Sequence, residues 1–247
     1  MLTQHVLLSR RHAELTQSER DILRRAIAEV RVYEARRTLV HQGDPVNTSI
    51  LLLDGLMSRH VDDLDGARQL VAVQIAGDFV DLHGYPLKTL DHDVSTLTDV
   101  RVALVPHAEL ERIQIEHPLL ARKLWFLTLL DAAMHRKWIF RLGRLRATAR
   151  VAHFLCETNT RLSVVGLSAG RRFGLPLTQF DLGEICGLTS VHVNRVMREL
   201  RDCGLVTFRS SWVEIHDLAG LAHLGEFDPG YLYLNAEVSG AMQGIDQ

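Results

Sequence analysis

The chain has 247 residues, of which 47% are hydrophobic and 23% charged, an ordinary composition for a soluble globular protein with one large or two small domains. The formal net charge is −2 at pH 7, so any case for nucleic-acid binding must rest on local patches. No apolar run reaches the roughly 18 residues of a membrane span, and the first residues lack the order of a signal peptide. We therefore expect a cytoplasmic protein without a membrane partner.

Three cysteines, Cys156, Cys186 and Cys203, lie in the second half of the chain. None forms a CxxC pair, and their spacing suits neither zinc nor an iron–sulfur cluster. We expect no metal and no cofactor. The cysteines are interpreted mainly as buried small apolar residues, with a thiol sensor as the alternative.

The first third of the chain changes from a helical to a β pattern. Residues 16–29 are predicted to form an amphipathic helix, because Thr16 followed by Glu19 is the pattern of a capping box. From Val30 to Val105 short apolar runs alternate with turn residues, as in a β-sandwich or barrel. The glycines expected at its corners are Gly43, Gly55, Gly66, Gly77 and Gly84.

Two helices are predicted after the β region, a short one from Pro106 and a long one from Pro118 to about Leu142. The apolar residues of the long helix cover more than one face, so one face can pack on the β region and the other needs a second partner. The same helix of another subunit is the simplest partner, and a wholly buried core helix is the alternative. Gly143 is the expected hinge, followed by a helix over residues 147–161.

The end of the long helix is basic. No acidic residue occurs between His135 and Arg150. Two interpretations stay open: cations placed at a helix C-terminus, with solvated stems, or a basic strip that faces a DNA backbone. The basic residues are Arg136, Lys137, Arg141, Arg144, Arg146 and Arg150.

Residues 177–205 are predicted to form two helices joined by a tight turn. Thr178 is a good N-cap with Asp181 three residues later, and Gly187 suits the left-handed conformation of a helix C-terminus. Thr189 caps the second helix, whose apolar positions recur about every 3.6 residues. Those positions are Val193, Val196, Met197 and Leu200.

The outward side of this second helix carries no acid between Ser190 and Arg198. It includes Asn194 and Arg195, residue types that pair well with base edges and phosphates. Gly183 lies where the two helices must approach closely, so the pair has the character of a helix-turn-helix. Two β-like runs follow, over residues 206–208 and 212–215, and predict a hairpin wing.

The remaining C-terminal segments give weaker signals. Residues 163–176 are expected to form a loop. The tail starts helical after Asp217 and then loses its periodicity, and the last ten residues are expected to fray. Four apolar side chains of the tail are candidates to pack back on the protein: Phe227, Tyr231, Tyr233 and Leu234.

A β-roll, a long helix and a winged helix-turn-helix, in this order, resemble the Crp/Fnr superfamily of bacterial transcription regulators. The motifs that carry the resemblance are GDFVDLHG at 77–84, the His117-Pro118 helix start, LRATARVAHFL at 145–155 and LTQFDLGEICGLTSVHVNRVMRELRDCGLV at 177–206. The TSVHVNR core is similar to a branch frequent in alphaproteobacteria.

The resemblance implies an α+β fold with four regions. These are a double-stranded β-helix of the cyclic-nucleotide-binding type over residues 1–117, a dimerisation helix with its hinge over 118–143, a winged helix-turn-helix over 144–225, and a tail over 226–247. It also implies a homodimer that reads a palindromic site on double-stranded DNA with the helix 189–203, and it admits RNA polymerase as a partner.

The resemblance assigns roles to the matching DNA-binding positions. Thr178, Gln179 and Thr189 would contact phosphates, and Arg195 matches an arginine that contacts guanine or phosphate. Many family members carry glutamate in place of Val191, which cannot accept a hydrogen bond from cytosine but could pack on a thymine methyl. The residues expected on the DNA side of the second helix are Ser190, Val191, His192, Asn194, Arg195 and Arg198.

The sensor residues depart from the family pattern. Cyclic-AMP-binding members use a glutamate for the ribose, and an arginine with a serine or threonine for the phosphate. An ungapped pairing from Gly77 places Leu82, His92 and Asp93 at those positions. A carboxylate facing a phosphate would repel it by several kcal/mol, so we expect no cyclic-AMP binding of the usual kind. The effector pocket, for an unidentified small molecule, is assigned to Leu82, His83, His92, Asp93, His135 and Arg136.

Two other sensor types and two other function classes are less consistent with the sequence. The oxygen-sensing branch needs an N-terminal cysteine cluster, and no cysteine precedes Cys156. A lone His83 or His92 on a β-roll is more often a turn residue than a haem ligand. A cyclic-nucleotide-type ligand-binding module without DNA function would not need the TSVHVNR helix. The sequence has no G-x-S-x-G, H-E-x-x-H or phosphate-binding loop, so we expect no enzyme.

Overall fold

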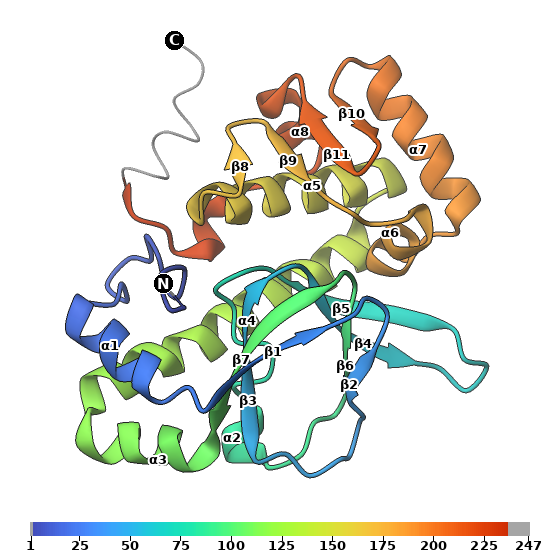
Figure 1. The fold of residues 1–247 in the computed structure, drawn as a ribbon. Coiled ribbons are helices and arrows are strands. Elements are labelled where there is room, and N and C mark those ends of the chain that lie inside the picture. Colours follow the sequence, from blue (N-terminus) through green and yellow to red (C-terminus); the bar gives the residue numbers. More distant parts are fainter. Residues whose placement is uncertain (1, 237–247) are drawn as a thin grey trace. The chain divides into compact units, whose positions relative to one another are not determined.

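The computed structural model describes residues 2–236 and shows two compact units, whose boundary falls after Ala132 inside a long helix (Figure 1). The first unit contains α1 (Gln17–Arg25), β1 (Glu29–Tyr33), β2 (Thr38–Val40), β3 (Thr48–Asp54), β4 (Met57–Asp62), β5 (Arg68–Gln74), α2 (Gly84–Leu87), β6 (Asp93–Thr96), β7 (Val100–Pro106), α3 (His107–Glu116) and the start of α4 (Pro118–Arg144).

The predicted β region forms two antiparallel sheets, with strand orders β1-β7-β3 and β2-β6-β4-β5. The β3 strand pairs with β7 over most of its length, so residues far apart in sequence lie side by side. Tight corners depend on glycine: Gly55 has a positive φ, and a Cβ atom there would lie 2.3 Å from the Asp99 carbonyl oxygen. The fold class expected from the sequence is confirmed.

In the sheet of order β1-β7-β3, the strands β3 and β7 are largely buried on both faces, and their alternate side chains point to opposite sides. Ile50 and Val102 face a core enclosed between the two sheets. Leu51 and Ala103 face a second core, which also receives side chains from α1, α3 and α4. The long helix is therefore held on the outer face of β3 and β7 by apolar burial.

The helix predicted near the N-terminus is confirmed, with a changed C-terminal limit. Thr16 and Glu19 form the predicted capping box, but α1 ends at Arg25. The segment before α1, which gave no signal in the sequence, packs on the β-roll through the fully buried Val6. Gly77 permits this approach, because a Cβ atom there would lie 2.6 Å from the His5 carbonyl oxygen.

The helix break does not fall at Gly143, the residue predicted as the hinge. Helix α4 continues through Gly143 to Arg144, and the break falls at Leu145 and Arg146, where Arg146 is the extended N-cap of the next helix. Arg150 Nε donates to the Leu145 carbonyl at 2.8 Å and so stabilises the break. Glycine inside a helix costs only about 1 kcal/mol relative to alanine, which packing of the surrounding turns can offset.

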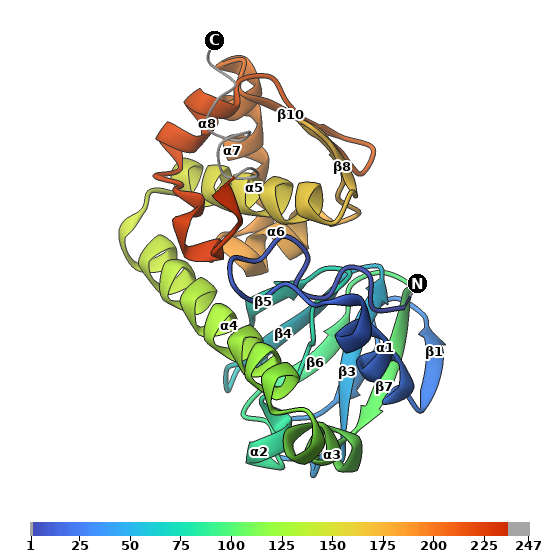
Figure 2. The same cartoon turned by 90° about the vertical axis from the view of Figure 1, so that its left-hand side faces the viewer.

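The second unit is built around the helix-turn-helix (Figure 2). Besides the end of α4 it contains α5 (Ala147–Val164), β8 (Ser168–Ala169), β9 (Arg172–Gly174), α6 (Gln179–Cys186), α7 (Ser190–Asp202), β10 (Val206–Arg209), β11 (Trp212–Ile215), α8 (Leu218–Leu224) and η1 (Pro229–Leu232). The segment 163–176, expected as a loop, supplies β8 and β9. These strands join the predicted wing hairpin in a sheet of order β10-β11-β9-β8, and such short strands have no signal of their own until a neighbour pairs with them.

As expected, Phe227 and Tyr231 of the tail pack on His153 of α5, and Leu234 is buried, whereas Tyr233 is exposed. The Tyr231 hydroxyl donates to Oε2 of the buried Glu157 at 2.5 Å. The expectation that the last ten residues fray lies outside the described residues. Within the described part of the chain, no helix is both long and apolar enough to cross a membrane.

Candidate nucleic-acid interface and sensor cavity

The first helix of the predicted pair begins with a closed hydrogen-bond ring. The Asp181 backbone N–H donates to Thr178 Oγ1 at 3.1 Å, and the Thr178 backbone N–H donates to the Asp181 carboxylate at 2.7 Å. This capping box satisfies amides that helix geometry would leave without partners. Thr178 and Gln179 remain exposed beside it, at a helix end whose dipole favours a phosphate.

The turn between α6 and α7 depends on two glycines. Gly187 ends α6 in the left-handed conformation, with φ 63°. A Cβ atom on Gly183 would lie 2.4 Å from the Leu188 carbonyl oxygen, and the Leu188 N–H donates to the Gly183 carbonyl at 2.9 Å. The sequence prediction that Gly183 marks the close approach is confirmed, and the contact fixes the angle at which α7 leaves the turn.

The second helix presents the predicted residues to solvent. Thr189 caps it by accepting from the His192 N–H at 3.3 Å, while Val193, Val196 and Leu200 are buried. Val191 is 82% exposed, although it is apolar and lies within a well-packed unit. Thr189, His192, Asn194, Arg195 and Arg198 are exposed, and Ser190 is half-buried.

The wing adds basic side chains that sequence reasoning missed. Ser210 and Ser211 both have positive φ and form the two-residue turn between β10 and β11. Arg209 precedes this turn and is exposed. Arg172 comes from β9 and stacks on Trp212, with its guanidinium carbon 5.0 Å from the ring centroid. The register of β9 on β11 brings them together, and the sequence alone carried no signal for that pairing.

The basic segment after His135 divides into two groups. Arg141 is fully buried, stacks on Trp138 and donates to the Ile185 carbonyl at 3.0 Å. Arg150 donates to the Cys186 carbonyl at 3.3 Å. Both therefore bind the C-terminal carbonyls of α6, where cations are favoured, and the DNA-strip interpretation does not apply to them. Exposed members are Arg136, Arg144 and Arg146.

In the first unit, a buried ion pair joins the β-roll to the long helix. Arg59 of β4 donates to both carboxylate oxygens of Asp131 of α4, from Nη1 to Oδ2 at 2.7 Å and from Nη2 to Oδ1. The Arg59 side chain is 4% exposed and that of Asp131 22%. A bidentate pair of this kind fixes both geometry and charge, and no sequence pattern indicated that these two residues meet.

Two of the predicted effector residues lie beside this pair. The rings of His83 and His92 are 5.2 Å apart, and His92 Nδ1 is 2.7 Å from an Asp91 carboxylate oxygen. Burial, with the positive charge of Arg59 nearby, lowers the pKa of His83 to about 4. Burial also lowers the pKa of His92. Both rings are therefore neutral at pH 7.

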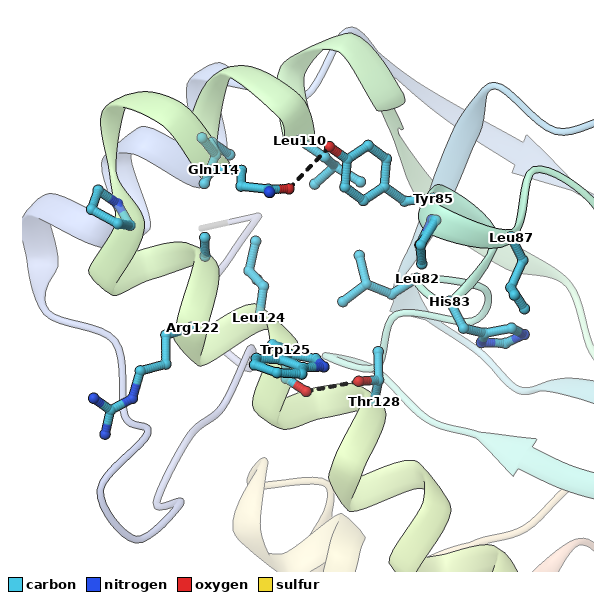
Figure 3. A pocket seen from close by; sticks show the side chains of 14 residues that line it. Leu82, His83, Tyr85, Leu87, Leu110, Gln114, Arg122, Leu124, Trp125 and Thr128 are labelled. Carbon is cyan, nitrogen blue, oxygen red and sulfur yellow. Dashed lines mark hydrogen bonds between the residues drawn. The ribbon is translucent and has the colours of Figure 1, made fainter.

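A cavity of about 730 Å³ lies among α2, α3 and the first half of α4 (Figure 3). Leu82 and His83 contribute to its lining, as do Tyr85, Gln114 and Trp125. Figure 3 shows Leu82 pointing into this space, with Trp125 and Tyr85 on different sides of it. Its size is typical of a small-molecule site.

The other predicted effector residues do not line this cavity. Asp93 accepts from the Gln42 N–H at 2.7 Å and lies 3.5 Å from His60 Nε2. His135 and Arg136 belong to the second unit. The structure thus brings together three of the six predicted residues, Leu82, His83 and His92, because the spacing of a single alignment does not reveal which side chains the fold turns inward.

The cysteines separate by burial. Cys156 and Cys186 are buried and Cys203 is exposed. Desolvation raises the pKa of the Cys156 and Cys186 thiols, which keeps them in the unreactive thiol form. In the described part of the chain, no group of three or more His, Cys, Asp or Glu side chains could hold a metal ion.

Comparison with known families matches both halves of the chain. Residues 30–117 match the cyclic nucleotide-binding domain, and residues 149–224 match the Crp-like helix-turn-helix domain. The "Probable transcriptional activator" of Rhizobium leguminosarum bv. viciae is 30% identical over 193 residues, which are 78% of this chain and 77% of that protein. The chain belongs to the Crp/Fnr family of transcription regulators.

Further relatives agree with this membership. The "Transcriptional activator protein FnrL" of Cereibacter sphaeroides is 29% identical over 181 residues, 71% of each chain. The solved structure of FixK2 from Bradyrhizobium japonicum superposes with a TM-score of 0.73 at 25% identity, over 80% of this chain and 97% of that one. This family member is therefore a transcription regulator with a helix-turn-helix DNA-binding domain.

Proposed function

We propose that this regulator acts in the cytoplasm as a homodimer that reads a palindromic operator with α7 of each subunit. The observation that carries the proposal is the exposed face of α7 over residues 190–198, which contains no acidic residue and on which Asn194 and Arg195 stand clear of the unit's own core. Arg bidentate to guanine and Asn to adenine are the base contacts these side chains favour. Two such helices one duplex turn apart, about 34 Å, would occupy successive major grooves.

Phosphate contacts would orient each helix. Thr178, Gln179 and Thr189 lie at the two helix N-termini, where backbone amides and the helix dipole attract a phosphate. Arg198 follows on α7, and Arg209 of the wing would reach the flanking backbone. Val191 provides an apolar contact, so we propose that the operator has a thymine where relatives with glutamate read cytosine.

The exposed apolar residues of α4 support the dimer. Trp125, Leu129 and Ile139 are 67%, 57% and 71% exposed. With Ala132 and Arg136 at the intervening positions, the spacing alternates between four and three residues, as in a coiled coil whose seam includes one arginine. Apolar side chains exposed at this spacing are explained by a partner helix, whereas a wholly buried core helix would leave none exposed.

We further propose that this regulator does not bind cyclic AMP in the family's usual way, and that it has no catalytic function. The Arg59 guanidinium is already bound by the Asp131 carboxylate, and the residues at the nucleotide positions are apolar Leu82, neutral His92 and acidic Asp93. A cyclic phosphate would meet repulsion without a free cation. Titration calorimetry with cyclic AMP and cyclic GMP should give no binding heat, and micromolar affinity for either would contradict this.

The test of DNA reading is a gel-shift titration with a duplex selected in vitro from a randomised library. Arg195→Ala should weaken specific binding by about 1–3 kcal/mol. Arg201→Ala is the matched control: Arg201 lies on the same helix but pairs with Asp202 at 3.3 Å, and its loss should change affinity little. If wild-type protein selects no sequence and retards no promoter fragment at modest salt, the proposal is wrong.

A further inference from the structure

The cavity among α2, α3 and α4 has the features of a built site. Its floor consists of apolar side chains that are at most 8% exposed: Leu82, Leu110, Ile113 and Leu124. The aromatic rings of Tyr85 and Trp125 stand at its sides (Figure 3). An apolar, aromatic-walled space of this size is suited to a flat, largely apolar molecule.

The polar groups at the cavity are few and mostly paired. The Tyr85 hydroxyl donates to Gln114 Oε1 at 3.2 Å, and the Thr128 hydroxyl donates to the Trp125 backbone carbonyl at 2.8 Å. This arrangement leaves the Gln114 amide nitrogen as a donor at the same edge as Tyr85. A ligand could therefore place one hydrogen-bond acceptor there while the rest of its surface stays apolar.

Two cations lie at the cavity: Arg122 belongs to its lining, and Lys88 Nζ is 4.8 Å from the centroid of the Tyr85 ring. His83 is uncharged at pH 7, because burial lowers its pKa to about 4. In Figure 3 the Arg122 side chain leaves α4 and points away from the space enclosed by the other side chains. Arg122 and Lys88 are both exposed, so the apolar floor gives an entering ion no buried partner for its lost hydration, and the cavity favours an uncharged molecule.

Of the positions that the family resemblance assigns to a cyclic nucleotide, Leu82, His92 and Asp93, the cavity lining contains Leu82 alone. Its lining on α4 ends at Thr128, seven residues before His135, and neither His92 nor Asp93 lines it. Asp131, one turn beyond Thr128, is paired with Arg59. The polar residues that a nucleotide would need are thus absent from the cavity lining.

Trp125 connects the cavity to the proposed dimer helix. Its side chain lines the cavity and is also 67% exposed at a heptad position of α4. A molecule packed against the Trp125 ring would restrict its rotamers and change the surface that α4 offers a partner helix.

We propose that this cavity binds an uncharged, largely apolar small molecule with a planar ring system, and that this molecule is the effector of the regulator. The effector role depends on the proposed DNA-binding function, whereas the binding site does not.

The uncharged dye N-phenyl-1-naphthylamine and its sulfonated, anionic analogue 1-anilinonaphthalene-8-sulfonate form a matched pair of probes. Fluorescence titration of the full chain should show one site per subunit for the uncharged dye, with a dissociation constant on the order of 1–10 µM, and at least about tenfold weaker binding of the anion. Equal affinity for the two dyes would contradict the proposed selectivity.

Variants locate the site. Ala121→Phe places a ring in the cavity from α4 and should abolish binding of the uncharged dye, as should Thr128→Phe further along the same helix. Leu119→Phe is the control, because Leu119 is 72% exposed on the first turn of α4 and does not line the cavity. Unchanged dye affinity in both cavity variants, with native circular dichroism, would overturn the proposal.

Two further measurements separate the outcomes. Saturating dye should change the affinity of wild-type protein for its selected duplex at least about threefold, and should not do so in Ala121→Phe; dye binding without this effect would show that the effector role is wrong. If dye binding disappears as sedimentation shows dimer formation, the partner's helix fills the cavity and the proposal fails. A protein that binds the dye but no DNA would refute only the proposed function.

Discussion

The helix-turn-helix and the β-roll of this regulator place their functional side chains in opposite directions. In the α6–α7 pair the functional side chains must face away from the core, so caps, a turn glycine and a 3.6-residue repeat are enough to place them. In the β-roll they must face inward, so their neighbours come from strands and helices distant in sequence. The comparison explains why one site follows from a short stretch of sequence while the other depends on packing.

The largest effect is expected at the Arg59–Asp131 pair, which joins the β-roll to a residue distant in the sequence. Asp131→Ala should lower the free energy of unfolding by about 3 kcal/mol, because it leaves the buried Arg59 guanidinium without its carboxylate. Urea unfolding measures this. The double variant Arg59→Met with Asp131→Leu should recover much of the loss, and a double variant as unstable as the single one would show that packing and not charge is decisive.

The helix-turn-helix has a comparable weak point within a single turn. Gly183→Ala should destabilise the second unit by about 2–3 kcal/mol, because the added Cβ atom would lie 2.4 Å from a backbone oxygen that cannot move without opening the turn. Gly174→Ala on β9, where a Cβ atom has nothing within 4 Å, is the matched control. Gly183→Ala should lower the melting temperature and weaken DNA binding in the gel shift. An unchanged melting temperature and an unchanged affinity would show that the close approach at Gly183 does not hold the turn together.

The stability of the β-roll should also depend on pH. Burial raises the pKa of Asp81 from 3.8 to about 7 while its Oδ1 accepts from the Ile50 N–H at 2.6 Å. The folded state then holds a proton that the unfolded chain releases, so the contribution of Asp81 to stability is lost as the pH rises from about 4 to about 7.

Asp81→Asn keeps the acceptor and removes the titration. The variant should gain on the order of 2 kcal/mol over wild type at pH 8 and little at pH 4. Unfolding curves across this range measure the difference. A constant difference at all pH values would mean that the Asp81 carboxyl does not take up a proton on folding.

The smallest expected effect tests whether the N-cap at Thr189 stabilises the start of α7. Thr189→Ala removes the oxygen that accepts from the His192 N–H and should cost about 1 kcal/mol, while Thr189→Ser should cost less. Circular dichroism and urea unfolding report the change. If the alanine variant is as stable as wild type, the surrounding unit, and not the cap, holds the start of α7.

The amino-acid sequence by itself determined the helix-turn-helix, its caps at Thr178 and Thr189, the close approach at Gly183 and the outward set from Ser190 to Arg198. All of these depend on contacts within a few residues, which local spacing encodes. The sequence also determined the β character of residues 30–105 and the apolar surplus of the long helix, since both follow from periodicity.

Only the tertiary structure decided which arginines serve the fold and which face solvent. Arg141 and Arg144 are similar in the sequence, yet one is buried against Trp138 and the other is exposed. Likewise it alone brought Arg59 to Asp131, β9 to the wing, and Leu82 with Trp125 to one cavity. These pairings join segments tens of residues apart, and their energy comes from burial and charge that exist only after the chain has closed on itself.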